Sequence, residues 1–224
     1  PRMAMTIIYP GMDWNGTVVN TLDKTINGKD NANYPPSANN ASKTALTWRK
    51  YLDEQYANGI WNTNACPIVI RYAEVLLTYA EAVNELSGPS ADVYDKLDLI
   101  RGRVGMPKVD REKYASKETL RRLIRRERGV ELAGEGVRRA DILRWKDDNG
   151  KMVAETVLNG VLERVVGTVN YAETDPTKRA EIDTNAPATD KKIEDRVFKV
   201  HNRYNPIPQG AIDNNPNLEQ NPGY

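Results

Sequence analysis

The sequence predicts a mainly α-helical protein with long irregular loops and only minor β-structure. Over residues 68–146 apolar side chains recur every three or four positions, which is the period of an amphipathic helix. On both sides of this stretch the chain is rich in Asn and Pro, which favour turns over regular elements. We therefore expect a loop-rich region (1–67), a helical scaffold (68–146) and a loop-rich C-terminal segment (147–224).

The first region contains one short apolar stretch, residues 5–9, which ends at Pro10-Gly11 and predicts a brief strand followed by a turn. Residues 11–66 show little periodicity. A loop of this length in a compact domain is usually functional or disordered. It carries three of the four tryptophans of the chain, namely Trp14, Trp48 and Trp61.

Four helices are predicted in the scaffold, over residues 68–87, 90–104, 117–134 and 137–146. The first is apolar around much of its circumference, so it should contact neighbours on more than one side. Ser116 is the expected N-cap of the third helix, and Gly134 its end. Paired amphipathic helices at this spacing are similar to tetratricopeptide units, so the fold class is one of tetratricopeptide-like helical hairpins.

The last third of the chain gives weaker signals. Between residues 152 and 169 helix and strand both remain open, and residues 170–195 are polar enough to predict a loop. Residues 196–200 alternate as a strand does. Residues 204–224 contain so much Pro and Asn that extended or turned backbone is expected.

Composition excludes several classes of protein. The 224 residues carry 32 Lys and Arg against 31 Asp and Glu, a net charge of +1, so no whole-chain field selects nucleic acid or a membrane. Cys66 is the single cysteine, which excludes an internal disulfide framework and any multi-cysteine metal site. No apolar run approaches the ~20 residues that span a bilayer. The start, Pro1-Arg2, lacks the features of a signal peptide and suggests a mature or truncated piece.

Several motifs together resemble the SusD/RagB family. They are RYAEVLL (71–77) with YAEA (79–82), LIRGRVGMP (99–107), IRRER (124–128) with the residues Glu131-Leu132, Glu135-Gly136, Arg138, Asp141-Ile142 and Arg144-Trp145, and IP (207–208) through NPNL (215–218) to QNPGY (220–224). Pro1-Arg2 with Thr6-Ile7 looks like the D-P-R element of the family without its Asp. The matches follow the order of the family and cover most of the chain.

This resemblance implies a lipid-anchored protein on the outward face of the outer membrane in Bacteroidetes-type bacteria. Such proteins bind oligosaccharides, or peptides in some members, and lie over a SusC-like TonB-dependent transporter. Family members are much longer, so we expect a C-terminal portion that lacks the lipid-attachment cysteine. Cys66, in the middle of the chain, is no substitute. We predict a non-catalytic glycan-binding protein without cofactor or metal.

Three carboxylates, Glu127, Glu131 and Glu135, follow one another at one-turn spacing and invite a metal-site hypothesis. A dinuclear site would need histidines on a partner helix, and the only histidine is His201 in the tail. A structural ion-pair network is the better interpretation. The expected partners are Arg101, Arg103, Arg138, Arg139 and Arg144.

Other chemistries find little support. Residues 117–146 hold ten Lys or Arg against five Asp or Glu, but the isoelectric point of about 8.2 favours a solvated face with salt bridges over a nucleic-acid surface. No Gly-x-Ser-x-Gly motif is present. A glycoside hydrolase needs only two carboxylates, and the sequence does not select a pair.

Aromatic stacking is the remaining candidate chemistry. The apolar C–H faces of sugar rings pack on indole or phenol rings, and nearby Asn side chains bind the hydroxyls. The predicted ligand residues are Trp14, Tyr34, Trp48 and Trp61. The alternative is that these rings anchor the loop to the helices. Two rival functions stay open, a peptide- or protein-interaction scaffold and a glycoside hydrolase.

Overall fold

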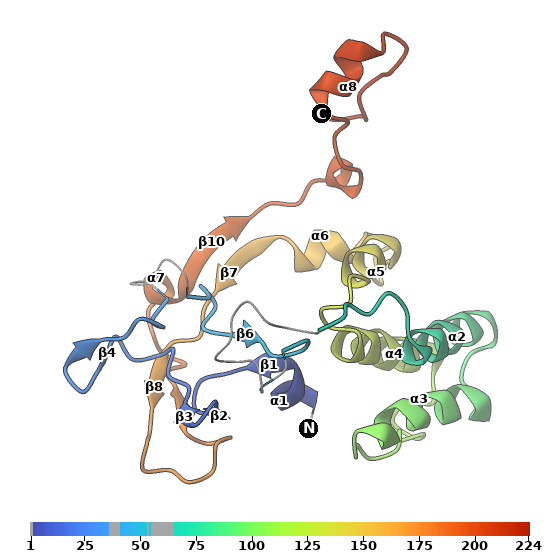
Figure 1. The fold of residues 1–224 in the computed structure, drawn as a ribbon. Helices are drawn as coiled ribbons and strands as arrows, with labels where there is room; N and C mark the ends of the chain where they lie inside the picture. Colours follow the sequence, from blue (N-terminus) through green and yellow to red (C-terminus); the bar gives the residue numbers. More distant parts are fainter. Residues whose placement is uncertain (1, 36–40, 53, 55–64) are drawn as a thin grey trace. The chain divides into compact units, whose positions relative to one another are not determined.

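The computed structural model describes residues 2–35, 41–52, 54 and 65–224, and it shows a helix-rich chain with small β-ribbons (Figure 1). The helices are α1 (Arg2–Thr6), α2 (Tyr72–Ser87), α3 (Ala91–Arg103), α4 (Lys117–Glu131), α5 (Arg138–Arg144), α6 (Val153–Val157), α7 (Ala188–Lys191) and α8 (Gln209–Asn214), with the 3₁₀ turn η2 (Val200–Arg203). The predicted fold class is confirmed.

The strands of the described residues form five two-stranded antiparallel ribbons. They pair as β1 (Ile7–Ile8) with β6 (Thr47–Trp48), β2 (Asp13–Trp14) with β3 (Thr17–Val18), β4 (Thr25–Ile26) with β5 (Lys29–Asp30), β7 (Gly160–Glu163) with β10 (Lys192–Arg196), and β8 (Gly167–Val169) with β9 (Ala180–Ile182). Two ribbons turn through Asn15-Gly16 and Asn27-Gly28, all four residues having positive φ. Such Asn-Gly pairs favour tight hairpins.

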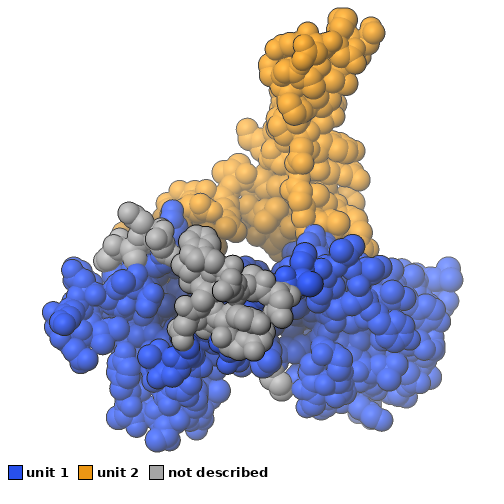
Figure 2. All heavy atoms as spheres, viewed as in Figure 1, with its two compact units in different colours: residues 1–138, 165–186 blue, residues 139–164, 187–224 orange. Residues whose placement is uncertain are grey.

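The chain divides into two compact units, which Figure 2 shows in different colours. The first comprises residues 1–138 and 165–186, and the second residues 139–164 and 187–224. The second unit has its own small core around Ile142, Met152 and Ala154.

The main core of the first unit lies between α2, α3 and α4, where α2 packs against both of the other helices (Figure 1). Its fully buried side chains include Leu77, Leu97, Leu120, Leu123 and Ile124. Local sequence determines where two helices begin. The Ser90 and Ser116 hydroxyls accept hydrogen bonds from the backbone N–H groups of Val93 and Thr119, so the predicted cap of α4 at Ser116 is confirmed.

The predicted helix ends differ from the observed ones by a few residues. α2 begins at Tyr72, and residues 68–71 are not helical. α4 ends at Glu131, and the chain then passes through Gly134 and Gly136, whose φ values are +77° and +81°. Glycine adopts this left-handed backbone without the steric cost that a side chain imposes, and it breaks the helix.

The expected contact of α2 on more than one side is confirmed, since both α3 and α4 pack on it. A second apolar stripe nevertheless remains exposed. Tyr72, Val75, Tyr79 and Leu86 follow one face of the helix and are 70%, 49%, 44% and 86% exposed. The helix therefore has more apolar surface than this pair of neighbours covers.

A second cluster in the first unit fastens the Asn-rich segment. Leu22 and Ala45 pack with Val169 of β8. The buried Asn20 side chain donates to Asp23 and to the hydroxyl of Tyr171, at 2.6 and 2.9 Å. Much of residues 18–45 is thus held by specific contacts.

Four expectations for irregular segments need correction. In the stretch 5–9 only Ile7 and Ile8 form a strand, because Met5 and Thr6 belong to α1. Residues 170–195 are not one loop, since β8 and β7 provide hydrogen-bond partners for β9 and β10. The strand predicted at 196–200 ends at Arg196, whose partner Gly160 is the first residue of β7. Pro208 precedes the short helix α8 in the tail, a position that proline tolerates.

We expect Leu97→Ala to lower the free energy of unfolding by about 2–5 kcal/mol, because it opens a cavity in a fully buried site. Leu99→Ala is the matched control, since Leu99 lies on the same helix and is 59% exposed. Urea denaturation followed by circular dichroism measures both. Equal losses would contradict the core described above.

Candidate functional site

The C-terminal half of α4 carries an ion-pair network that joins distant parts of the first unit. Glu127 accepts hydrogen bonds from Arg101 at 2.5 Å and from Arg2 at 2.6 Å. One turn further on, Glu131 accepts them from the guanidinium groups of Arg71 at 2.8 Å, Arg103 at 2.7 Å and Arg2 at 3.2 Å. Glu127 and Glu131 are each 3% exposed. The hydrogen bonds from the guanidinium groups therefore compensate for the hydration that the two carboxylates lose on burial.

Glu135 joins the network although α4 has ended. Its carboxylate accepts from Arg71 Nε at 2.7 Å and from the Lys50 ammonium. Lys50 also donates to the carbonyls of Glu131 and Ala133, at 3.1 and 3.0 Å. A cation at this position satisfies the unpaired carbonyls and the partial negative charge of a helix C-terminus.

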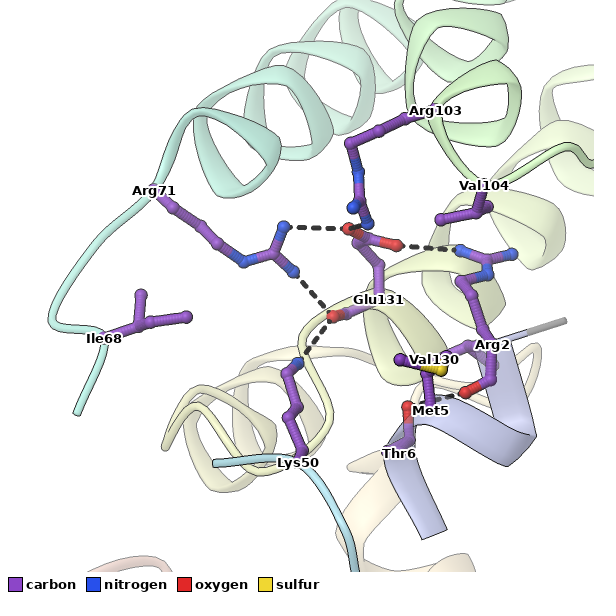
Figure 3. Close-up of a pocket in the computed structure, with 10 residues that line it drawn as sticks. All are labelled: Arg2, Met5, Thr6, Lys50, Ile68, Arg71, Arg103, Val104, Val130 and Glu131. Carbon is purple, nitrogen blue, oxygen red and sulfur yellow. Dashed lines mark hydrogen bonds and ion pairs between the residues drawn. The ribbon is translucent and has the colours of Figure 1, made fainter. Parts of the chain in front are cut away.

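The network borders a hollow of about 470 Å³, which we call the cationic hollow (Figure 3). Its walls are Arg2, Met5, Thr6, Lys50, Ile68, Arg71, Arg103, Val104, Val130 and Glu131. The side chains of Arg71, Arg103 and Arg2 converge on the Glu131 carboxylate from three segments (Figure 3). Four cations and one carboxylate line this hollow, with apolar surface between them.

The ion pairs change the proton affinity of the buried carboxylates. Burial alone raises the pKa of Glu131, but three guanidinium groups lower it more strongly, and the pKa lies below the ordinary value of 4.5. The same holds for Glu135. Burial raises its pKa, but its partners Arg71 and Lys50 lower the pKa more strongly, to below the ordinary value of 4.5. Both side chains are therefore anions near neutral pH.

The predicted structural network is confirmed, and two of its expected partners are found in it. Arg101 and Arg103 bind the carboxylates as expected. Arg144 instead pairs with Asp141 at 2.8 Å, and Arg139 bonds Asn202 and Asn205. Sequence reasoning missed Arg2, Lys50 and Arg71, because they lie 60 to 129 residues from their partners and no local pattern connects them.

The basic cluster of α4 is a face of salt bridges and solvated side chains, as expected. Arg121 binds both carboxylate oxygens of Glu85, at 2.5 and 2.6 Å. Arg128 donates to the hydroxyl of Thr78 at 3.0 Å. Arg122 is exposed.

A second hollow, of about 360 Å³, lies beside the β1–β6 ribbon and is called here the Trp48 hollow. It is lined by Ile7, Ser42, Thr44, Leu46, Thr47 and Trp48. Trp48 is 54% exposed, and three of the other lining residues bear hydroxyl groups. No charged side chain is among these described lining residues. An open ring beside neutral hydroxyls is suited to a ligand with both apolar faces and hydrogen-bonding groups.

The fold holds the indole of Trp48 in place. Its backbone pairs with Ile7 across the ribbon. A Cβ on Gly134 would stand 3.4 Å from the indole ring, so glycine permits this close approach. Ala45 and Tyr51, on either side of β6, have φ values of +66° and +73°. This left-handed conformation has an energetic cost for residues other than glycine, and such strain is common at binding sites.

The other predicted ligand residues are less open. Trp14 is half-buried, and the Arg49 guanidinium lies 5.2 Å from its ring centre. Tyr34 is also half-buried. Trp61 lies outside the described residues. Trp48 lines one hollow and the cations line the other, whereas neither Trp14 nor Tyr34 is among the described lining residues of either.

Among the described residues, no three His, Cys, Asp or Glu side chains gather in a way that would hold a metal ion. Cys66 is exposed and, as the single cysteine of the sequence, forms no disulfide within the chain. Every helix in the described ranges of the chain is too short or too polar to cross a bilayer.

The helical scaffold, its terminal motifs and the carboxylate–guanidinium network define the class of protein. A family model described as the SusD family matches residues 1–224, and the chain belongs to that family. It is 34% identical over 154 residues to a SusD-like protein of Formosa agariphila, an alignment that covers 64% of this chain and 29% of that protein.

Two solved structures show the same fold over the whole chain. A SusD-like protein from Bacteroides fragilis superposes with a TM-score of 0.71 at 24% identity, and a SusD homologue from Bacteroides thetaiotaomicron with a TM-score of 0.59 at 22% identity. The chain spans 38% and 40% of those two proteins.

We expect Glu131→Ala to lower the free energy of unfolding by about 3–5 kcal/mol, because it leaves several cations without their buried partner. Glu85→Ala is the matched control. It breaks a partly exposed pair with Arg121 and should cost about 1 kcal/mol or less. Denaturant unfolding measures both, and a similar small loss for each would contradict a structural role of the network.

The low pKa values of Glu131 and Glu135 predict acid sensitivity. Their contribution to stability is fully present above about pH 4.5, the ordinary glutamate value, and is lost as the pH falls through the lower pKa values of the folded chain. We expect the free energy of unfolding to decrease in this acidic range. The decrease should be smaller in Glu131→Gln, and parallel curves for the two proteins would contradict the assignment.

Proposed function

We propose that this chain is part of a non-catalytic cell-surface protein that binds oligosaccharides and delivers them to a SusC-like TonB-dependent transporter of the outer membrane. Membership of the SusD family supports the general role. The observation that carries the proposal is the half-exposed Trp48 indole, in a hollow whose other described lining residues include three that bear hydroxyl groups and none that is charged.

The proposed binding mode is stacking on a pre-formed platform. One face of a sugar ring lies on the Trp48 indole, and ring hydroxyls exchange hydrogen bonds with Ser42, Thr44 and Thr47. One or two stacked rings at about 0.5–1.5 kcal/mol each and a few hydrogen bonds at about 1 kcal/mol net must offset about 4–15 kcal/mol of association cost. Burial of apolar area supplies the rest, and only narrowly. We therefore expect micromolar to millimolar affinity, which suits capture followed by release.

The remaining predicted ligand residues extend this proposal. Trp14, Tyr34 and Trp61 would contribute further contacts from the loop-rich region 1–67, with the scaffold 68–146 as support. Attachment to the outer membrane, with an outward orientation, would come from a lipid anchor. No cofactor is required for binding of this kind.

One rival function has a structural observation in its favour. The exposed stripe of Tyr72, Val75, Tyr79 and Leu86 on α2 is suited to the apolar face of a peptide or protein helix. The chain would then act as an interaction scaffold.

A glycoside hydrolase is less well supported. A general acid needs a raised pKa, whereas the pKa values of Glu131 and Glu135 are lowered and their oxygens are occupied by cations. This group of carboxylates is thus poorly suited to that chemistry.

Trp48→Ala should weaken oligosaccharide binding about tenfold or more, since it removes the stacking face and its buried area. Titration of a broad panel of soluble oligosaccharides, followed by tryptophan fluorescence and calorimetry, measures the effect. Tyr72→Ala is the matched control because it removes another exposed ring from the same unit.

The result also separates the two functions. Loss of binding in Trp48→Ala with full binding in Tyr72→Ala supports glycan binding. No response to any oligosaccharide, together with peptide binding that Tyr72→Ala abolishes, would overturn the proposal in favour of the scaffold.

A further inference from the structure

The two hollows are immediate neighbours on the β1–β6 ribbon. Thr6, the last residue of α1, lines the cationic hollow, and the next residue, Ile7 of β1, lines the Trp48 hollow. Lys50, two residues after β6, lines the cationic hollow, and Trp48 of β6 lines the other. The Thr6 carbonyl accepts hydrogen bonds from the N–H groups of Arg49 and Lys50, at 2.9 and 3.2 Å. One or two residues of backbone, about 4–7 Å, therefore separate the linings of the two hollows.

The charges of the hollows differ sharply. The Trp48 hollow has no charged side chain among its described lining residues. Around the other hollow, the network joins five cations, Arg2, Lys50, Arg71, Arg101 and Arg103, to three carboxylates, Glu127, Glu131 and Glu135. This leaves a local charge of +2, in a chain whose total is only +1.

Arg103 is the network cation best placed to contact a ligand. Its side chain is 60% exposed, against 11% to 23% for the other four. Its Nη2 donates to Glu131, a single hydrogen bond from a group with five donors. Glu131 keeps Arg2 and Arg71 as partners. Arg103 can therefore turn toward an anion without leaving that carboxylate unpaired.

The walls between the cations suit a sugar better than a bare ion. Met5 and Val130 are 64% and 42% exposed at the hollow, and Ile68 and Val104 complete its apolar surface. A volume of about 470 Å³ is large for an inorganic anion and suitable for a ring that bears a charged substituent.

We propose that the two hollows form one bipartite site for an acidic oligosaccharide, which stacks one ring on Trp48 and places the sulfate or carboxylate of a neighbouring ring in the cationic hollow beside Arg103. This inference rests on the proposed function, which it narrows from glycans in general to glycans that carry negative charge.

The test compares a neutral oligosaccharide that binds with its chemically sulfated derivative, and adds hexagalacturonate as a carboxylate probe. Calorimetry is performed at an ionic strength of about 0.01 M and of about 1 M, where the Debye length falls from about 30 Å to about 3 Å. The proteins are the unmodified chain, Trp48→Ala, Arg103→Gln and Arg122→Gln. Arg122 is the matched control, an exposed arginine of the same unit that lines neither hollow.

We expect the sulfated derivative to bind about three- to fivefold more tightly than the neutral one at low salt, the effect of a surface ion pair, and this preference to vanish at high salt. Arg103→Gln should reduce the preference, Arg122→Gln should retain it, and Trp48→Ala should weaken both ligands. Circular dichroism confirms that each variant is folded.

Three outcomes would overturn the inference. If neutral and sulfated ligands bind equally and Trp48→Ala weakens both, glycan binding stands and the acidic preference fails. If no oligosaccharide binds, the proposed function itself fails. If hexaglutamate or inorganic sulfate binds as tightly as the acidic sugars and Trp48→Ala has no effect, the cationic hollow is an anion site unconnected with sugar.

Discussion

The first unit depends on the neutralisation of three buried glutamates near the end of α4. Glu127, Glu131 and Glu135 give up hydration, and cations from four separate segments bind their carboxylates. The same contacts that satisfy the carboxylates attach α1, the residue before α2 and the end of α3 to α4. One electrostatic requirement thus fixes the relative positions of elements that are far apart in the sequence.

The network also holds the segment that carries Trp48, the proposed ligand residue. Lys50 is bound to the end of α4, and the strand that carries Trp48 lies two residues before it. Residues 47–50 are therefore held at both ends, by the β1 pairing and by the network. These two attachments restrain the backbone that carries the half-exposed indole, although the described strands of this segment are only two residues long. Rigidity lowers the entropy cost of binding.

The α2 helix has apolar side chains on two of its faces, one buried and one exposed. Leu77 and Ala80 are fully buried against the core, whereas the stripe through Tyr72, Tyr79 and Leu86 faces outward. A helix that is apolar on two sides belongs in an architecture of stacked helices, in which each unit covers part of its neighbour. The chain spans 38% to 40% of the solved SusD-like structures that share its fold.

The sequence alone determined the helical scaffold, the cap at Ser116, the breaks at Gly134 and Gly136, and the placement of acidic residues one turn apart, because each rests on spacing within a few residues. The hairpins at Asn15-Gly16 and Asn27-Gly28 were not predicted, although Asn-Gly pairs are a local signal for such turns. Only the tertiary structure decided that Arg2, Lys50 and Arg71 are the missing partners and that β9 and β10 are strands, since these pairings join residues that no local pattern relates. It also distinguished Trp48 from Trp14, because the exposure of a ring depends on what the rest of the chain packs against it.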